Sequence, residues 1–132
     1  MSFIDKIALI LVKDRKTLVA RSKGKEIFFT PGGKREGNET DEQALVREVK
    51  EELGVDVIIK TIAPYGTFQA QAHGKPEGTM VRITCYTAQY SGELVASSEI
   101  EELRWITSAQ RADTTVTGQM IVDDLKAKDL ID

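Results

Sequence analysis

The chain has 132 residues, a length at which one hydrophobic core can form without disulfide bonds or structural metals. Charged residues make up 30% of the sequence, but both signs are mixed, which excludes a disordered and strongly charged chain. The formal net charge of -3 does not suit a polynucleotide backbone, so no long nucleic acid is expected as a partner. We expect a single domain over residues 1–132.

The N-terminal segment has the pattern of a buried strand. Lys6 to Lys13 is a continuous apolar run bounded by charges, which is typical of a strand buried on both faces. The run is too short to cross a bilayer, and Asp5 and Lys6 interrupt any signal peptide. We therefore expect no membrane partner and a cytoplasmic location.

A turn, two short strands and a glycine loop are expected next. Asp14 to Lys16 predicts the turn, Thr17 to Arg21 the second strand, and Ile27 to Phe29 a short apolar stretch. In Thr30 to Gly33, paired glycines allow backbone geometries that other residues cannot adopt. This loop is therefore predicted to approach another group closely.

A helix is predicted from Thr40 to Leu53. Thr40 and Gln43 have the spacing of an N-terminal capping box, strong helix formers follow, and Gly54 is placed as a C-cap. A helical projection separates two faces. The packing face comprises Leu45, Val46, Val49 and Leu53, and the opposite face comprises Asp41, Ala44, Glu48, Glu51 and Glu52.

The middle of the chain predicts two strands separated by breakers and a loop. Val55 to Ile62 is strand-like, and Pro64 and Gly66 are expected to end it. His73 to Gly78 is a polar loop. Thr79 to Tyr90 alternates apolar residues on an inner face with residues such as Tyr86 on an outer face, which predicts a half-buried strand.

The C-terminal part adds a short strand from Leu103 to Ile106 and an amphipathic helix from Thr117 to Lys128. Cys85, the one cysteine, lies among alternating apolar residues and is interpreted as a core residue rather than a catalytic thiol. Strands mixed with two helices predict an α/β or α+β layered domain.

Glu48, Glu51 and Glu52 place three carboxylates on one face of the predicted helix. Their charges repel at these spacings, and no lysine at matching positions on that face relieves the repulsion. Hard divalent cations such as Mg²⁺ combine carboxylate ligands with waters and substrate phosphates, so this face suits a metal. A solvated acidic face is the alternative interpretation of these three residues.

The segment from Gly33 to Val55 resembles the Nudix box, G-x5-E-x7-R-E-U-x-E-E-x-G-U, in which U is aliphatic. The sequence fits all nine specified positions, which makes a chance match very rare. The resemblance implies an α/β/α sandwich with a mixed sheet. It also implies a hydrolase that cuts a phosphoanhydride bond in a nucleoside diphosphate linked to another group.

The resemblance further implies roles for individual residues. In this family a metal-activated water attacks phosphorus, and a backbone carbonyl at the position of Gly33 often joins the carboxylate ligands. The residues implied to bind Mg²⁺ or Mn²⁺ are Gly33, Glu48, Glu51 and Glu52. Glu39 and Arg47 match residues that orient the loop and the helix, and these two side chains are expected to pair.

The general base could be a glutamate of the box or one of a later acidic loop. The candidates are Glu51 and Glu48 in the box, and Glu99 and Glu102 in the segment before Trp105. For the later pair, an acidic loop that leads into an edge strand is the alternative interpretation.

Substrate contacts are expected from basic and aromatic side chains. Arg21, Lys34, Arg35 and Arg82 are the candidates for phosphate, although each could equally be a solvated charge. His73 and Lys75 could belong to a substrate lid. A base could stack on one of four aromatic rings, those of Phe28, Phe29, Tyr86 and Trp105.

The box specifies the bond that is cut but not the nucleotide. An ordinary or oxidised nucleoside triphosphate, cut to monophosphate and pyrophosphate, is favoured because the short chain lacks room for the extra N-terminal sheet of dimeric ADP-ribose hydrolases. ADP-ribose or a sugar nucleotide is the alternative. A nucleotide-sensing module is disfavoured by the complete set of box glutamates, and an isoprenoid diphosphate isomerase by the single cysteine. The chain could be a monomer or a homodimer.

Overall fold

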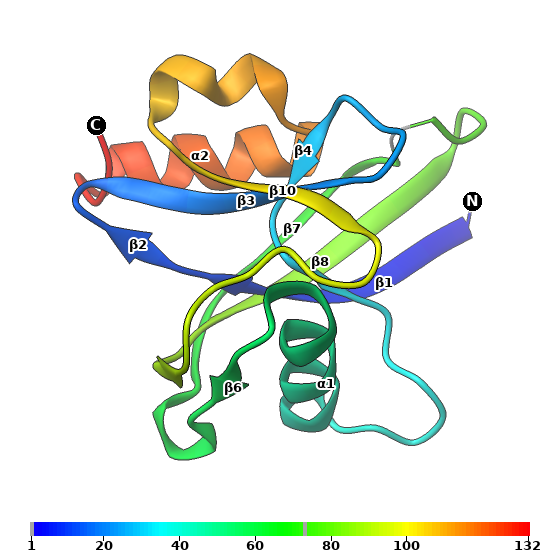
Figure 1. The fold of residues 1–132 in the computed structure, drawn as a ribbon. Helices are drawn as coiled ribbons and strands as arrows, with labels where there is room; N and C mark the ends of the chain where they lie inside the picture. Colours follow the sequence, from blue (N-terminus) through cyan, green and yellow to red (C-terminus); the bar gives the residue numbers. More distant parts are fainter. Residues whose placement is uncertain (1, 73) are drawn as a thin grey trace.

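The computed structural model describes residues 2–72 and 74–132, with a four-stranded sheet at its centre (Figure 1). Its strands are β1 (Ser2–Ile10), β5 (Gly32–Gly33), β7 (Ala63–Gln71) and β8 (Thr79–Thr87), in the order β5-β1-β8-β7. β1 and β8 are parallel, whereas β5 and β7 run antiparallel to the strands they border. The central sheet is therefore mixed, as predicted.

Two smaller sheets complete the strand arrangement. One contains β10 (Ile100–Ile106), β3 (Lys16–Ser22) and β2 (Val12–Lys13) in this order, with β4 (Phe28–Phe29) also paired to β3. The other is the short pair of β6 (Asp56–Val57) and β9 (Tyr90–Ser91). Of two 3-10 helices, η1 (Ile59–Thr61) lies between β6 and β7, and η2 (Ser108–Asp113) lies between β10 and α2.

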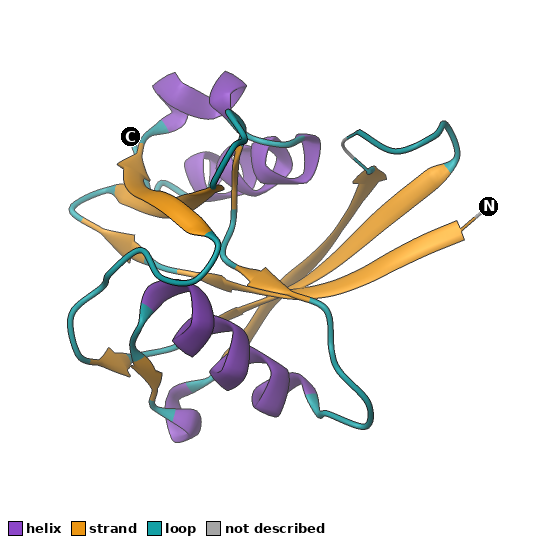
Figure 2. Ribbon diagram, turned by 45° about the vertical axis from the view of Figure 1, so that its right-hand side comes forward, coloured by secondary structure: helices purple, strands orange, loops and turns teal. Residues whose placement is uncertain are grey.

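Helices α1 (Asp41–Leu53) and α2 (Val116–Ala127) lie on opposite sides of the central sheet (Figure 2). β1 serves both sides, because Ile7 and Leu9 pack in the core with α1, while Ala8 and Ile10 pack in the core with α2. This confirms the strand buried on both faces and the layered α/β arrangement. No helix of the described residues is long and apolar enough to cross a membrane.

The caps of α1 are those predicted from the sequence. The Thr40 hydroxyl accepts a hydrogen bond from the Gln43 backbone N–H at 3.1 Å, and the Gln43 side chain accepts one from the Thr40 N–H at 2.9 Å. Gly54 ends the helix in the left-handed region at φ 71°, where glycine is favoured. Ala44, however, is fully buried and Val46 only partly, so the packing face is rotated from the expected one.

The strand expected over Val55 to Ile62 is wrong. Only Asp56–Val57 is extended there, and the long strand is β7, which includes Pro64 and Gly66. β7 is an edge strand, where a missing N–H leaves no sheet partner unsatisfied, and a bulge lies between Pro64 and Gly66. The two residues interpreted as breakers are therefore accommodated inside the strand.

The starts of two strands and the orientation of one side chain also differ from the sequence predictions. β1 begins at Ser2 because its parallel pairing with β8 starts at Thr79, and β10 begins at Ile100, so Glu102 lies in a strand rather than a loop. Tyr86, expected to face outward, packs against the core of α1. Cys85 is fully buried as predicted, and burial raises the pKa of its thiol to about 12.

Candidate active site

The glycine loop lies directly against β1 and α1. β5 pairs with β1 so that Gly32 is opposite Ala8 and Gly33 opposite Ile7. A Cβ atom on Gly32 would overlap the Ile7 carbonyl oxygen, and one on Gly33 would overlap the Glu48 carboxylate. The predicted close approach is confirmed, and its partners are the β1 backbone and a helix glutamate.

Arg47 connects this loop to α1. Its guanidinium donates two hydrogen bonds of 2.8 Å to the two carboxylate oxygens of Glu39, so the expected pair is present. It also donates to Glu48 Oε1 at 2.7 Å and to the Lys34 carbonyl at 2.9 Å. One side chain therefore holds the box loop and the helix carboxylate in a common arrangement.

Glu39 is strongly stabilised in its ionised form. The Arg47 guanidinium, together with the Glu36 backbone N–H at 2.7 Å, lowers the pKa of Glu39 to about 2. Its side chain is only 19% exposed. Fixed charge-assisted hydrogen bonds of this kind position Arg47 for its second contact with Glu48.

Glu52 lies on the same side of α1 as Glu48, facing the glycine loop. Its Oε1 accepts a hydrogen bond from the Gly32 N–H at 2.9 Å. Burial raises the pKa of Glu52 to about 8, with added contributions from the charges of Glu48 and Glu51. The two carboxylates that meet the loop thus form a poorly solvated anionic pair, which a cation would stabilise.

The third glutamate of the helix is arranged differently. The Glu51 side chain is 51% exposed, and its nearest cationic atom is Arg47 Nη1 at 3.5 Å. Among residues 2–72 and 74–132, no three acidic, histidine or cysteine side chains converge closely enough to surround a metal on their own. Any metal would therefore need further oxygen ligands besides the Glu48 and Glu52 carboxylates.

Lys6 also belongs to this region, although its sequence context alone did not identify it as a site residue. It projects from β1, is partly buried, and lies close enough to Glu52 and Glu48 for their charges to act on its pKa. In the sequence it only bounded an apolar run. A charged residue directly before a run of buried strand positions was the available signal, but the strand pairing was needed to interpret it.

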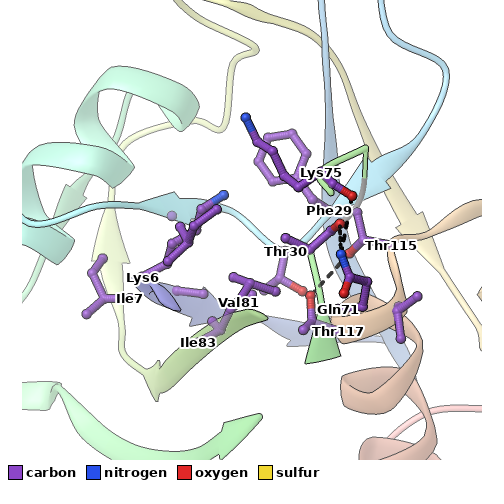
Figure 3. Close-up of a pocket in the computed structure, with 15 residues that line it drawn as sticks. Lys6, Ile7, Phe29, Thr30, Gln71, Lys75, Val81, Ile83, Thr115 and Thr117 are labelled. Atoms are coloured by element: carbon purple, nitrogen blue, oxygen red, sulfur yellow. Dashed lines mark hydrogen bonds between the residues drawn. The ribbon is translucent and has the colours of Figure 1, made fainter. Parts of the chain in front are cut away.

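A cavity of about 150 Å³ opens beside the glycine loop, between β1, β7, β8 and the start of α2 (Figure 3). Its wall includes Lys6 and Gly32, so the cavity adjoins the carboxylates. Apolar and hydroxyl groups form much of the rest, namely Phe29, Thr30, Val81, Ile83, Thr115 and Thr117. Of the four aromatic rings considered for base stacking, Phe29 is the one in this wall, within the described residues.

The loop after β7 is fixed by Gln71. The Gln71 side-chain amide donates to the Pro76 carbonyl at 2.8 Å, and its oxygen accepts from the Gly78 N–H at 3.0 Å. Lys75 from this loop lines the cavity. His73, the other residue expected in a lid, lies outside the described residues.

Several candidate residues are bound to other side chains away from the cavity. Arg21 pairs with Glu102 at 3.2 Å, and Arg104 pairs with the same carboxylate at 3.0 Å. These two arginines lower the pKa of Glu102, with Arg104 contributing more. Arg21 and Glu102 therefore satisfy each other in the structure.

Arg35 and Arg82 are likewise engaged with aspartates. Arg35 pairs with Asp41 at 2.5 Å and with Asp5 at 3.4 Å, and Asp41 also accepts a hydrogen bond from the Tyr86 hydroxyl. Arg82 lies 3.5 Å from Asp5. Arg35 thus links the box loop to β1 and α1, and Arg82 links β8 to β1.

Glu99 and Lys34 remain close to the box. The loop before Glu99 contacts the end of α1, because the Ser97 N–H donates to the Glu52 carbonyl at 3.1 Å and the Val95 N–H to the Leu53 carbonyl at 2.9 Å. Lys34 is exposed, and its backbone is held by Arg47.

Comparison with known proteins places this geometry in a family. A model described as NUDIX domain matches residues 5–120. An ADP-ribose pyrophosphatase of Methanocaldococcus jannaschii is 34% identical over 96 residues, which are 70% of this chain and 55% of that protein. A CTP pyrophosphohydrolase of Escherichia coli is 29% identical over 110 residues, covering 80% of this chain and 76% of the relative. The solution structure of the E. coli ORF135 protein superposes with a TM-score of 0.74 at 25% identity, covering 100% of this chain and 96% of that one.

Proposed function

The chain belongs to the Nudix family, and from that premise we propose that it is a divalent-metal-dependent pyrophosphohydrolase for nucleoside diphosphate derivatives. The observation that supports this proposal most directly is the meeting of the glycine loop with Glu48 and Glu52 beside the cavity. A substrate seated in the cavity would present its phosphates to these carboxylates.

The donor set fits a divalent ion. Glu48 and Glu52 would supply carboxylate oxygens from α1, and the Gly33 carbonyl is the third proposed ligand, whereas Glu51 lies on the exposed side of the helix. Mg²⁺ or Mn²⁺ bound there would supply an activated water and positive charge for the phosphoryl oxygens. Arg47 and Glu39 act as positioning residues, since Arg47 orients Glu48 and fixes the loop through the Lys34 carbonyl.

We place the general base at Glu51. The competing carboxylates are occupied, because Glu48 accepts a hydrogen bond from Arg47 at 2.7 Å and Glu102 is held between Arg21 and Arg104. Glu51 is half-exposed, with a contact to Arg47 of only 3.5 Å, so it can accept a proton from water. Glu99 is the second candidate, from the loop that contacts the end of α1.

We propose a nucleoside triphosphate as substrate, cut to monophosphate and pyrophosphate. The cavity wall combines the Phe29 ring with threonine hydroxyls, a mixture that suits a nucleoside with an apolar face and polar edges. The alignment with the CTP pyrophosphohydrolase covers more of both chains than the alignment with the ADP-ribose pyrophosphatase. ADP-ribose and sugar nucleotides are the second proposed substrate class, because one relative is an ADP-ribose pyrophosphatase.

A substrate panel tests the proposal. Nucleoside triphosphates, oxidised nucleoside triphosphates, ADP-ribose, sugar nucleotides and dinucleoside polyphosphates are incubated with Mg²⁺ or Mn²⁺, and monophosphate and pyrophosphate are quantified. Glu52→Gln should lower kcat by roughly a thousandfold or more, because it removes a charged metal ligand. Glu93→Gln, an exposed residue near β9, is the matched control and should act like the parent.

Two results would contradict the assignment. If Glu52→Gln turns over as fast as the parent with metal present, the active site lies elsewhere. If the parent is silent across the whole panel but binds nucleotides, the chain is a nucleotide-sensing module.

A further inference from the structure

Lys6 lies at the junction between the cavity and the carboxylates. It lines the cavity wall, and the next residue of β1, Ile7, is opposite Gly33 in the strand register. Its position next to the glycine loop means that a ligand running from the cavity to Glu48 and Glu52 passes this ammonium group. Figure 3 shows Lys6 and Lys75 extending from two different elements at the cavity.

Lys6 has no ion-pair partner in the described part of the chain. No carboxylate oxygen among residues 2–72 and 74–132 lies within 4.0 Å of its Nζ, although the side chain is partly buried. Glu52 and Glu48 compensate the charge of Lys6 only from a distance, so a ligand that contacts this partly buried ammonium directly would stabilise it. Phosphate oxygens are suitable acceptors for a lysine in such a place.

Two further lysines add positive charge at the same place. Burial lowers the pKa of Lys6, and Lys34 and Lys75 each lie close enough to Lys6 for their charges to lower it further. Each comes from a separately fixed segment. The Lys34 carbonyl accepts a hydrogen bond from Arg47 at 2.9 Å, and the Lys75 carbonyl accepts one from Gln71 at 3.3 Å.

We infer that Lys6 binds the phosphate group next to the nucleoside, and that Lys34 and Lys75 flank this phosphate from the box loop and the loop after β7. This inference rests on the proposed function for the direction in which the substrate lies. The group adjoining the nucleoside is the first one beyond the cavity, and Lys6 is the cationic residue that belongs to both the cavity wall and the carboxylate region. Lys6 is thus a substrate-binding residue, distinct from the Arg47 network.

Binding of product-like probes tests Lys6 without turnover. Titration calorimetry without added metal compares the four nucleoside 5′-monophosphates AMP, CMP, GMP and UMP with the corresponding nucleosides. The parent should bind at least one monophosphate more tightly than its nucleoside. In Lys6→Met, which keeps side-chain length without charge, monophosphate affinity should fall roughly tenfold or more and nucleoside affinity should stay unchanged. Lys6→Arg should retain most of the monophosphate affinity.

Controls separate this inference from folding effects and from the proposed function. Lys60→Met removes an exposed lysine from η1 and should bind like the parent, and thermal unfolding should show Lys6→Met folded, with Lys6→Gln as the second variant. Equal monophosphate affinity in the parent and a folded Lys6 variant would overturn the inference, as would a parent that does not distinguish monophosphate from nucleoside. A parent without hydrolysis in the substrate panel, but with the Lys6-dependent difference, would reject the proposed function alone.

Discussion

Two arginines of this chain make nearly the same contacts and should have very different importance. Arg47 binds Glu39 through two hydrogen bonds of 2.8 Å, and Arg15 binds Asp129 and Asp132 through contacts of 2.6 Å. The Arg47 side chain is 21% exposed and the Glu39 side chain 19%, whereas those of Arg15 and Asp129 are 45% and 84% exposed. Exposed pairs of this kind are screened by water and salt.

The partners of the two arginines differ as well as their burial. Arg47 also donates a hydrogen bond to Glu48 and so orients this carboxylate, which lies against Gly33 in the candidate active site. Arg15 ties the turn between β2 and β3 to the end of the chain, through Asp129, Asp132 and the Asp129 carbonyl at 3.0 Å. Hydrogen-bond geometry alone therefore does not rank these interactions. The burial of each pair and the residues that its partners contact determine how important the interaction is.

Among variants that test the two arginine networks, the largest effect is expected from Gly33→Ala, which displaces Glu48, a partner of Arg47. In Gly33→Ala the new methyl group would occupy the position of the Glu48 carboxylate, so Glu48 must move away from Arg47 and the glycine loop. We expect kcat to fall by roughly a hundredfold or more, since small displacements of a ligand are costly. Steady-state kinetics on the substrate found in the panel measure this.

Gly66→Ala is the control for that substitution. Its methyl group would meet only the Phe68 ring at 3.8 Å, an ordinary packing distance. It should retain activity close to that of the parent. Full activity in Gly33→Ala would show that Glu48 is not needed where the structure places it.

A smaller effect is expected from Arg47→Lys. Lysine keeps the charge but cannot donate to Glu39, Glu48 and the Lys34 carbonyl together, because it lacks the planar guanidinium. Loss of a positioning contact of this kind lowers activity or metal affinity by roughly 10-fold to 100-fold. The same change in the exposed network, Arg15→Lys, should leave kcat and the KM for metal unchanged. Equal losses in both variants would remove the distinction between the two networks.

The smallest effect is a difference in acid stability. The pKa of Glu39 in the folded state, about 2, lies below its ordinary value of 4.5. Its stabilising contribution is therefore complete above pH 4.5 and is lost as the pH falls toward 2. Glu39→Gln should lower the Tm at pH 7, and the difference from the parent should shrink across this window. Thermal unfolding between pH 2 and 7 measures it.

Asp129 gives the matched comparison for acid stability. Arg15 lowers the pKa of Asp129 in the same direction, so Asp129→Asn should also cost most at neutral pH. Because this carboxylate is exposed, the Tm change should be about 3 °C or less and should vanish in 1 M salt. The Glu39→Gln difference should persist in salt. A salt-insensitive effect of Asp129→Asn would contradict the ranking by burial.

The parts predicted correctly from the sequence depend on short-range patterns. The capping box of α1, the C-cap at Gly54 and the buried strand β1 follow from residues within a few positions of one another. The Nudix box lies in the same stretch, so the carboxylate face and the Arg47–Glu39 pair could be expected together. Local geometry determines both.

The errors arose where a long-range neighbour decided the outcome. Pro64 was interpreted as a strand breaker from the sequence. In the structure β7 is an edge strand, which tolerates proline, and only the order of the strands in the sheet shows this. Arg21 and Glu102 were separate candidates, yet the pairing of β3 with β10 places them in mutual contact. Sequence spacing contains no information on such cross-strand partners.

The sequence by itself determined the family, the helix with its carboxylates and the glycines that approach it. Only the tertiary structure decided which charges are satisfied by neighbours and which face the cavity. Lys6 illustrates the reason. Its role depends on the position of β1 between β5 and β8, which brings it close to Lys34, Lys75 and the glutamates of α1. Burial and charge are properties of that assembled neighbourhood, and no local pattern in the chain encodes them.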